Sequence, residues 1–252
     1  MRLTIIGCAG SYAGPDSAAS CYLVEHEQDG RLWSILLDLG SGALGSLQRF
    51  ADPLSIDAVF LSHLHADHFF DLSGFYVLRK YHPSGPQPRI PVWGPAATAE
   101  RLAQAYGLPP DPGMTEEFDF REYGTEPLRF GPFTVTQRLV EHPIEAYALS
   151  VTAGGRRLVY TGDTGPCNGL TRFAQDADLL LAEAAFRDDC ENPPSLHLTG
   201  SDAARVALEA NARRLVLTHI APWHDRSVAL DEAATVFTGP TDLAVVGACF
   251  EI

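Results

Sequence analysis

Four side chains that can bind a metal ion follow one short apolar run in this sequence. The run at 59–61 is long enough for a buried strand, and it leads directly into His63, His65, Asp67 and His68. Because side chains alternate along a strand, its end can hold the first two histidines on one side, and the following turn can bring the other two ligands to an adjacent point. Four ligands within six residues suit two metal ions about 3.5–4 Å apart, as in two-metal hydrolases. A polar loop with three hydrogen-bonded histidines is the competing interpretation.

Three more candidate ligands, His142, Asp163 and His219, each follow a later apolar run that predicts a strand. In layered α/β proteins, ligands bind beyond the ends of the strands, so these runs are expected to converge on one site. We expect one metal ion to be bound by His63, His65, His142 and Asp163, and the other by Asp67, His68, Asp163 and His219. Such a pair leaves room for a bridging water, whose pKa a metal ion can lower to about 7. Buried structural histidines are the alternative for His142 and His219.

The elements that must position these residues are short strands and helices that alternate in the second half of the chain. Strands are predicted near 2–7, 20–25, 32–38, 57–62, 91–93, 127–130, 133–140, 146–152, 156–161, 178–182, 214–217 and 243–246. Helices are predicted near 43–51, 71–79, 96–106, 168–175, 200–211 and 227–236, and the segment 108–126 is expected to be mostly irregular. No linker or repeat divides the sequence, so we expect a single domain over 1–252.

The net charge and the residue composition limit the classes of molecule that this protein is expected to bind. The formal net charge of −14 argues against a protein that holds long nucleic acid, which normally presents a basic face to phosphates. It does not argue against a small anionic substrate, because two divalent ions dominate the local field. There is no run of 18 apolar residues and no signal-peptide pattern, so no membrane partner is expected. Five scattered cysteines without CxxC spacing predict a reducing, cytoplasmic compartment.

The motif His63-Leu-His-Ala-Asp-His68, preceded by Asp38-Leu-Gly40, resembles the signature of the metallo-β-lactamase superfamily. Three motifs in the second half resemble those of the RNase Z branch, whose members cleave phosphodiesters: Leu-Leu-Ala-Glu183, His197-Leu-Thr and Leu-Thr-His219. The resemblance spans nearly the whole chain. It implies an α/β fold, the αβ/βα four-layer sandwich of the metallo-β-lactamase fold, with helices outside two facing sheets. In that family the Asp-x-Gly turn is usually structural.

The resemblance also implies catalytic roles. The residue at the position of His197 meets the scissile phosphate, and the residue at the position of Glu183 orients it. Asp67 is a further candidate, as an acceptor of a proton from the attacking water. Glu183 has a non-catalytic alternative, in which its carboxylate caps a helix or is solvated. His197 also has one, in which it is only a neighbour of the helix cap Thr199. Imidazole and carboxylate ligands accept zinc, our first expectation, and also manganese or iron.

One departure from the family pattern concerns the substrate. RNase Z carries a long tRNA-clasping arm between the positions matching His142 and Asp163, and here only the 20 residues 143–162 separate them. This favours a small phosphodiester over tRNA. The flanks at 14–20, 79–84 and 218–223 look like bacterial atypical class II cyclic-AMP phosphodiesterases. We therefore expect hydrolysis of 3′,5′-cyclic nucleotides, cyclic AMP first, to the 5′-monophosphate. The alternatives are an RNase Z-like ribonuclease that processes tRNA 3′ ends, a hydrolase of other small cyclic phosphodiesters, and a binding module without catalysis.

Two residues are weaker candidates for substrate contacts. His82, beside Arg79 and Lys80, could line the mouth of the site, although a plain surface loop explains it equally well. Trp223 follows His219 by four residues and could stack on a nucleobase, with the packing of a turn as its alternative. The expected partners are a small nucleotide and, by the resemblance, a second copy in a homodimer, with no stable nucleic-acid complex.

Overall fold

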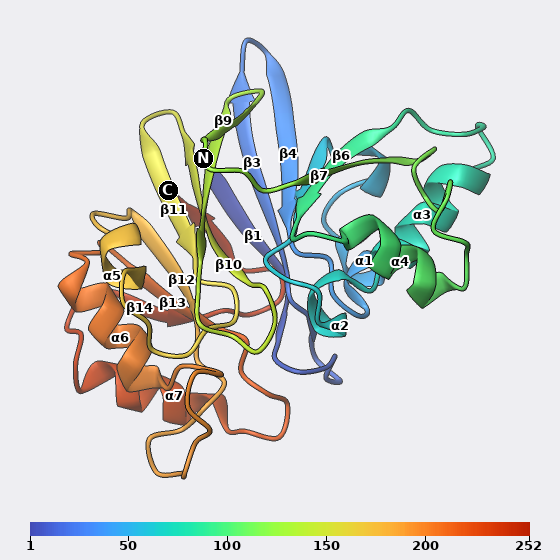
Figure 1. The fold of residues 1–252 in the computed structure, drawn as a ribbon. Coiled ribbons are helices and arrows are strands. Elements are labelled where there is room, and N and C mark those ends of the chain that lie inside the picture. Colours follow the sequence, from blue (N-terminus) through green and yellow to red (C-terminus); the bar gives the residue numbers. More distant parts are fainter.

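Two β-sheets lie face to face in the computed structural model, which describes all residues 1–252 (Figure 1). The first sheet has the strand order β15-β1-β3-β4-β5-β6-β7, with β2 paired to β1. Its strands are β1 (Arg2–Ala9), β2 (Ala18–Ala19), β3 (Cys21–Gln28), β4 (Arg31–Leu37), β5 (Ala58–Phe60), β6 (Ile90–Gly94), β7 (Phe118–Glu122) and β15 (Cys249–Glu251).

The second sheet is built from the other half of the chain and has the order β14-β13-β12-β11-β10-β9-β8. Its strands are β8 (Leu128–Phe130), β9 (Phe133–Leu139), β10 (Tyr147–Ala153), β11 (Arg156–Tyr160), β12 (Leu179–Glu183), β13 (Leu215–Thr218) and β14 (Thr241–Leu243). The strands β8 to β11 pair antiparallel, whereas β11 to β14 pair parallel.

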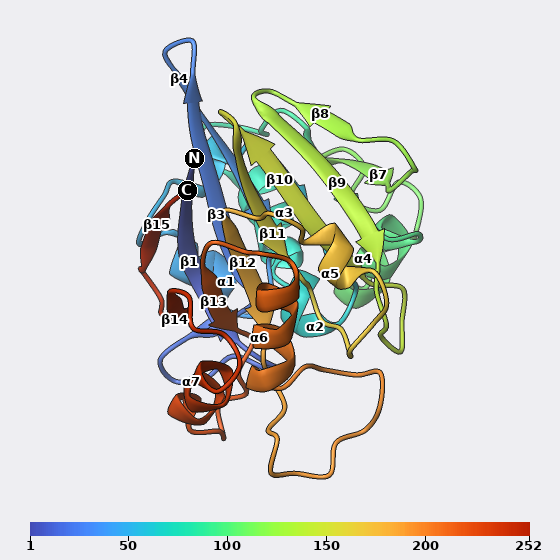
Figure 2. The same cartoon turned by 90° about the vertical axis from the view of Figure 1, so that its left-hand side faces the viewer.

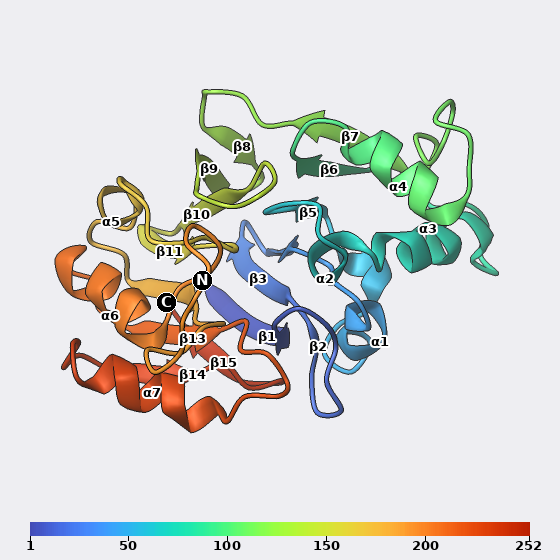
Figure 3. The same ribbon diagram turned by 60° about the horizontal axis from the view of Figure 1, so that its bottom comes forward.

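Helices cover the outer face of each sheet (Figure 3). The helices on the side of the first sheet are α1 (Ala43–Leu47), α3 (Leu72–Tyr81) and α4 (Thr98–Tyr106). Those on the second sheet are α5 (Leu170–Phe173), α6 (Gly200–Glu209) and α7 (Arg226–Ala234), which Figure 2 shows in front of that sheet. The short helix α2 (Ala66–Phe69) and the 3₁₀ turn η1 (Pro53–Ser55) complete the chain. No helix has the length and the apolar character that crossing a bilayer requires.

Three hydrophobic clusters show why the layers form. In β4, Ile35 and Leu37 point between the sheets, whereas Leu36 points outward beneath the helices, because side chains alternate along a strand. Strands covered on both faces therefore read as continuous apolar runs. One cluster joins the two sheets, and the other two join each sheet to its helices. The four-layer α/β sandwich expected from the sequence is confirmed.

Several local expectations need correction. The segment predicted to be mostly irregular contains β7, a half-exposed edge strand that pairs parallel with β6 and has too many charged residues to read as buried. The first helix ends at Leu47 rather than near residue 51, and the last predicted strand lies earlier, at Thr241–Leu243. Neither β15 nor the short helix α2 was expected; β15 owes its form to pairing with β1, at the opposite end of the chain.

Candidate metal centre

The candidate ligands come together at one rim of the sandwich. Strand β1 is antiparallel to β3, β3 is antiparallel to β4, and β4 is parallel to β5, so β1, β4 and β5 all end at this rim. The parallel strands β11, β12 and β13 end there from the opposite sheet. Side chains that follow these strand ends can therefore meet although they lie far apart in the sequence.

Three histidines form the first cluster. His63 and His65 follow β5, and His142 comes from the connection between β9 and β10 in the other sheet. The Nδ1 atom of His65 lies 3.1 Å from Nε2 of His63 and 3.0 Å from Nε2 of His142. Three ring nitrogens from two sheets thus converge on one point.

Two aspartates and two histidines, Asp67, His68, Asp163 and His219, form the second cluster, and all four are buried. The first pair belongs to helix α2, and the other two follow β11 and β13. Nε2 of His219 lies 3.1 Å from a carboxylate oxygen of Asp67 and 3.2 Å from Nε2 of His68.

Asp163 lies between the two clusters. One of its carboxylate oxygens is 3.7 Å from Nε2 of His63 and 3.3 Å from Nε2 of His219. The other oxygen is 3.3 Å from Nε2 of His68. This carboxylate can reach a metal ion in either cluster. The structure thus brings together all seven residues that the sequence singles out as ligands.

The donor set fits a pair of divalent cations. Ring nitrogens that face one another at 3.0–3.2 Å repel unless a cation or proton lies between them. Oδ1 of Asp163 is buried and has no hydrogen bond, which leaves a carboxylate oxygen free for a cation. Imidazole nitrogens together with carboxylate oxygens suit zinc, manganese or iron.

The ionisation of the cluster also favours bound cations. Burial lowers the pKa of His142 to about 4, and burial with the neighbouring His68 lowers the pKa of His63 well below its ordinary value, so both rings keep free lone pairs at neutral pH. Burial raises the pKa of Asp67, but the charge of His68 and a hydrogen bond with His219 outweigh it and hold that pKa far below its usual range. Neutral imidazoles and ionised carboxylates are the forms that bind metal ions. Burial lowers the pKa of His68, but Asp163, Asp38 and Asp67 outweigh it and raise that pKa well above its ordinary value, so this ring must release its Nε2 proton when a cation binds.

A buried carboxylate behind the ligands holds the second cluster in place. Asp38 accepts a hydrogen bond from Nδ1 of His68 at 2.8 Å, which leaves Nε2 of that ring directed at the cluster. The same carboxylate accepts bonds from the Ser62 amide at 2.6 Å, the Ser62 hydroxyl at 2.8 Å and the Tyr160 hydroxyl at 2.8 Å. Ser62 and Tyr160 were missed by the sequence reasoning, and Asp38 was expected to form only a turn. The Asp-x-Gly motif was the available signal.

Two more ligand rings, those of His63 and His142, are oriented by a partner at Nδ1. Because the Ser62 hydroxyl donates to Asp38, its oxygen accepts from Nδ1 of His63 at 3.0 Å. Nδ1 of His142 donates to the Leu196 carbonyl at 3.1 Å. In both rings the Nε2 atom is then free to bind a metal ion.

Glu183 and His197 lie together beside the second cluster. Glu183 ends β12 and is fully buried; its carboxylate accepts from the Thr164 amide at 2.7 Å and the Ala185 amide at 3.2 Å. It also lies 2.9 Å from Nδ1 of His197. The carboxylate is therefore not solvated, and it caps no helix.

The His197 ring faces the ligands rather than the helix that follows it. Its centroid is 5.4 Å from that of His219, whereas the cap of α6 is made by Thr199 with Asp202. Burial lowers the pKa of His197, but the charge and hydrogen bond of Glu183 outweigh burial and raise the pKa to about 9. Glu183 therefore favours the protonated form of this ring.

The two weaker candidates differ in position. His82 lies at the far end of α3, a ten-residue helix about 15 Å long, and its ring bonds only to Ser84 of its own loop. The structure does not bring it to the clusters, because α3 runs away from the metal stretch. Trp223 lies on the loop that begins at His219, and the residue is 61% exposed.

Comparisons with known proteins agree with this geometry. A family model described as "Beta-lactamase superfamily domain" matches residues 34–220. An uncharacterized protein of Mycobacterium leprae (strain TN) is 44% identical over 100% of this chain and 89% of its own length. The probable metallo-hydrolase YhfI of Bacillus subtilis (strain 168) is 32% identical over all of both chains, and its crystal structure, described as a metallo-beta-lactamase fold protein, superposes with a TM-score of 0.87 over 99% of each chain. A ribonuclease Z of Myxococcus xanthus (strain DK1622) is 30% identical over 100% of this chain and 98% of its own length.

Proposed function

This chain belongs to the metallo-β-lactamase superfamily, in its RNase Z-like branch, and on that premise we propose that it is a phosphodiesterase for small 3′,5′-cyclic nucleotides, with cyclic AMP as the first candidate. Under this proposal the products are nucleoside 5′-monophosphates. The residues that hold two divalent ions, zinc first, are His63, His65, Asp67, His68, His142, Asp163 and His219.

The observation that carries the proposal is the Glu183–His197 pair beside the ligand clusters. Bound divalent ions supply an activated water and neutralise phosphate oxygens. Breaking a 3′,5′-cyclic phosphodiester additionally needs a proton for the 3′ oxygen that leaves. His197 can provide it, because Glu183 occupies Nδ1 and keeps the ring protonated, so that Nε2–H is the atom free to donate.

Asp67 has a second proposed role. Its carboxylate stays ionised among the histidines, so it can accept a proton from the attacking water as well as bind a metal ion. One of its oxygens lies 3.1 Å from Nε2 of His219, another proposed ligand.

The connection between His142 and Asp163 supports a small substrate. The structure fills it with the hairpin of β10 and β11, whose strands pair from Leu149–Tyr160 to Ala153–Arg156. The hairpin turn at Gly154 and Gly155 leaves no chain for an arm that could grip tRNA. The net charge of −14 points the same way, because tRNA binding relies on basic surface.

The test is turnover by metal-loaded protein of cyclic AMP, cyclic GMP and 2′,3′-cyclic nucleotides, with metal content measured on the same sample. We expect 5′-monophosphate from the 3′,5′-cyclic substrates. If no cyclic nucleotide is hydrolysed, the proposal is ruled out. A tRNA precursor belongs in the same panel, because the similarity to ribonuclease Z keeps tRNA 3′ processing as the alternative. Turnover of the 2′,3′-cyclic substrates alone would indicate a hydrolase of another small cyclic phosphodiester.

The proposed setting is the cytoplasm, in line with five cysteines that are all free thiols. The proposed partners are the nucleotide and a second copy of the chain, with no stable nucleic-acid complex and no membrane. Sedimentation of the metal-loaded protein tests the homodimer.

A further inference from the structure

We propose that Tyr12 and Trp223 form a stacking platform for the nucleobase of the substrate, a role that rests on the nucleotide phosphodiesterase function proposed above. Their ring centroids are 5.4 Å apart, with planes tilted by 34°. Both residues are exposed, Tyr12 by 48% and Trp223 by 61%. The pair joins residues 211 positions apart, so neither the sequence nor its motifs reveal it.

The platform shares the rim with the ligand clusters. Tyr12 follows β1 and Trp223 follows β13, and both strands end at the rim where the candidate ligands gather. The loop that carries Trp223 begins with His219 itself. A nucleotide whose phosphate lies among the ligands would therefore project its ribose and base onto neighbouring loops at this rim.

Backbone contacts fix the two loops to each other. The Gly10 amide donates to the Ile220 carbonyl at 3.2 Å. A Cβ at Gly10 would lie 2.2 Å from the His219 carbonyl oxygen, so only glycine permits this approach. A Cβ at Gly14 would lie 3.1 Å from the Pro222 side chain. The position of the ring pair is thereby tied to a proposed metal ligand.

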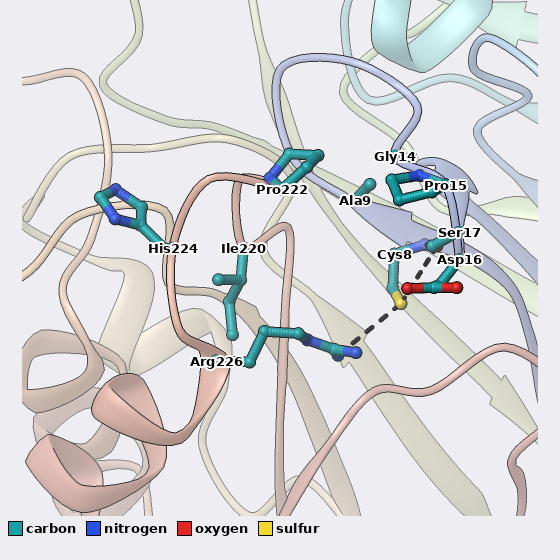
Figure 4. Close-up of a pocket in the computed structure, with 10 residues that line it drawn as sticks. All are labelled: Cys8, Ala9, Gly14, Pro15, Asp16, Ser17, Ile220, Pro222, His224 and Arg226. Atoms are coloured by element: carbon teal, nitrogen blue, oxygen red, sulfur yellow. Dashed lines mark hydrogen bonds between the residues drawn. The ribbon is translucent and has the colours of Figure 1, made fainter.

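The cavity beside Trp223 argues against the simpler explanation, that this residue only packs a turn. A cavity of about 140 Å³ lies between the same two loops, and Pro222 and His224, the neighbours of Trp223, help to line it (Figure 4). An indole that served only to pack this turn would be expected to fill that hollow. Instead the ring of Trp223 lies outside the cavity, where His224 accepts a hydrogen bond from its Nε1 at 3.1 Å.

Arg226, which helps to line the cavity, is held by hydrogen bonds within the protein. Figure 4 shows Arg226 reaching across to Cys8, and the guanidinium also donates to the Ala244 carbonyl. This guanidinium is therefore not free to bind a ligand, whereas the exposed rings of Tyr12 and Trp223 offer their faces as a surface for one. A flat, uncharged ring suits such a surface, because stacking uses the π-face that every base has.

The test compares binding of 5′-AMP and ribose 5-phosphate, which differ only in the base, to the metal-loaded protein, followed by tryptophan fluorescence and calorimetry. We expect 5′-AMP to bind about 5- to 100-fold more tightly and to quench Trp223 emission, since one stacked base contributes that range. Trp223→Ala and Tyr12→Ala should remove this preference, and Trp223→Phe should keep most of it. Tyr81→Ala, at a 65% exposed tyrosine on α3, is the matched control.

Kinetics supply a second readout. Trp223→Ala should raise KM for cyclic AMP about 5- to 100-fold with little change in kcat. Its loss of kcat/KM should be smaller on methyl 4-nitrophenyl phosphate, because this diester has no base. Equal losses on both substrates, equal binding of 5′-AMP and ribose 5-phosphate, or an altered oligomeric state with an unchanged KM would each overturn the platform. If the wild type turns over no cyclic nucleotide, the proposed function fails, while the binding comparison still decides the platform.

Discussion

Asp38 lies 2.8 Å from Nδ1 of His68, and both side chains are fully buried at the base of the second ligand cluster. The contact fixes which nitrogen of the ring carries the proton, so that Nε2 is presented to His219 and Asp163. Three further donors converge on the same carboxylate, two from Ser62 and one from Tyr160. One side chain therefore ties β4, β11 and the metal stretch together.

Replacing Asp38 should weaken metal binding. In Asp38→Asn the amide keeps the size of the side chain and tolerates its positive φ of 60°, but it presents N–H groups to donors. We expect metal affinity to fall about 10- to 100-fold, the usual effect of removing a group that orients a ligand. Competition with a chromogenic chelator measures it, and Asp231→Asn, at an exposed aspartate, is the control. Unchanged affinity would show that His68 needs no such support.

Gly40 provides a test of the packing against α2. A Cβ at Gly40 would lie 1.9 Å from the Asp67 carbonyl oxygen, so Gly40→Ala must displace the helix that carries Asp67 and His68. Overpacking of this kind costs about 1–3 kcal/mol, and we expect metal affinity to fall with stability. Denaturant unfolding and metal titration measure the two effects.

The matched glycine is Gly45 in helix α1, where a Cβ would meet nothing within 4 Å. Gly45→Ala should leave metal binding unchanged and stabilise the fold by about 0.5–1 kcal/mol, because alanine loses less backbone freedom in a helix. If the two alanine variants behave alike, the close approach at Gly40 does not hold the ligands.

The charge of His197 should depend on Glu183. The folded-state pKa of about 9 lies above the ordinary value, so the favourable pairing is fully present below about pH 6.5 and is lost as the pH rises through 9. In Glu183→Gln burial still lowers the pKa of His197 and the charge of Asp163 still raises it, but the attraction of Glu183 is gone, so that pKa should fall. The alkaline limb of kcat should move to lower pH, and the ring should titrate earlier by NMR. If the alkaline limb of kcat is unchanged in Glu183→Gln, the ionisation of His197 does not cause this pH dependence.

His197 itself should act on the reaction rather than on the metal ions. His197→Ala should lower kcat about 10²- to 10⁴-fold, the range for a positioned proton donor, while bound metal stays nearly constant. His219→Ala should lose metal, because His219 belongs to the second cluster. Metal analysis beside single-turnover kinetics distinguishes the two variants, and His82→Ala serves as a control histidine remote from the clusters. Loss of metal from His197→Ala would make that ring a ligand instead.

Much of the site could be predicted because its ligands are local or follow strong patterns. Residues 63–68 are neighbours along the chain, and the short apolar runs before His142, Asp163 and His219 each mark a strand end. The four-layer arrangement was also predictable, since strands buried on both faces alternate with helical segments. Edge strands such as β7 were not, because their form depends on a partner strand rather than on their own apolar pattern.

The amino-acid order alone determined the ligand types, their spacing and the lack of an arm between His142 and Asp163, because these are properties of residues read one after another. Only the tertiary structure decided that Asp38 holds His68 and that Tyr12 meets Trp223, and it gave the contact between Glu183 and His197 that the family resemblance had implied. Those pairs join separate strands and loops, and their geometry follows from how two sheets pack at one rim. The spacing of two residues in the sequence does not give their distance in space, since the chain between two contacting residues can be of almost any length.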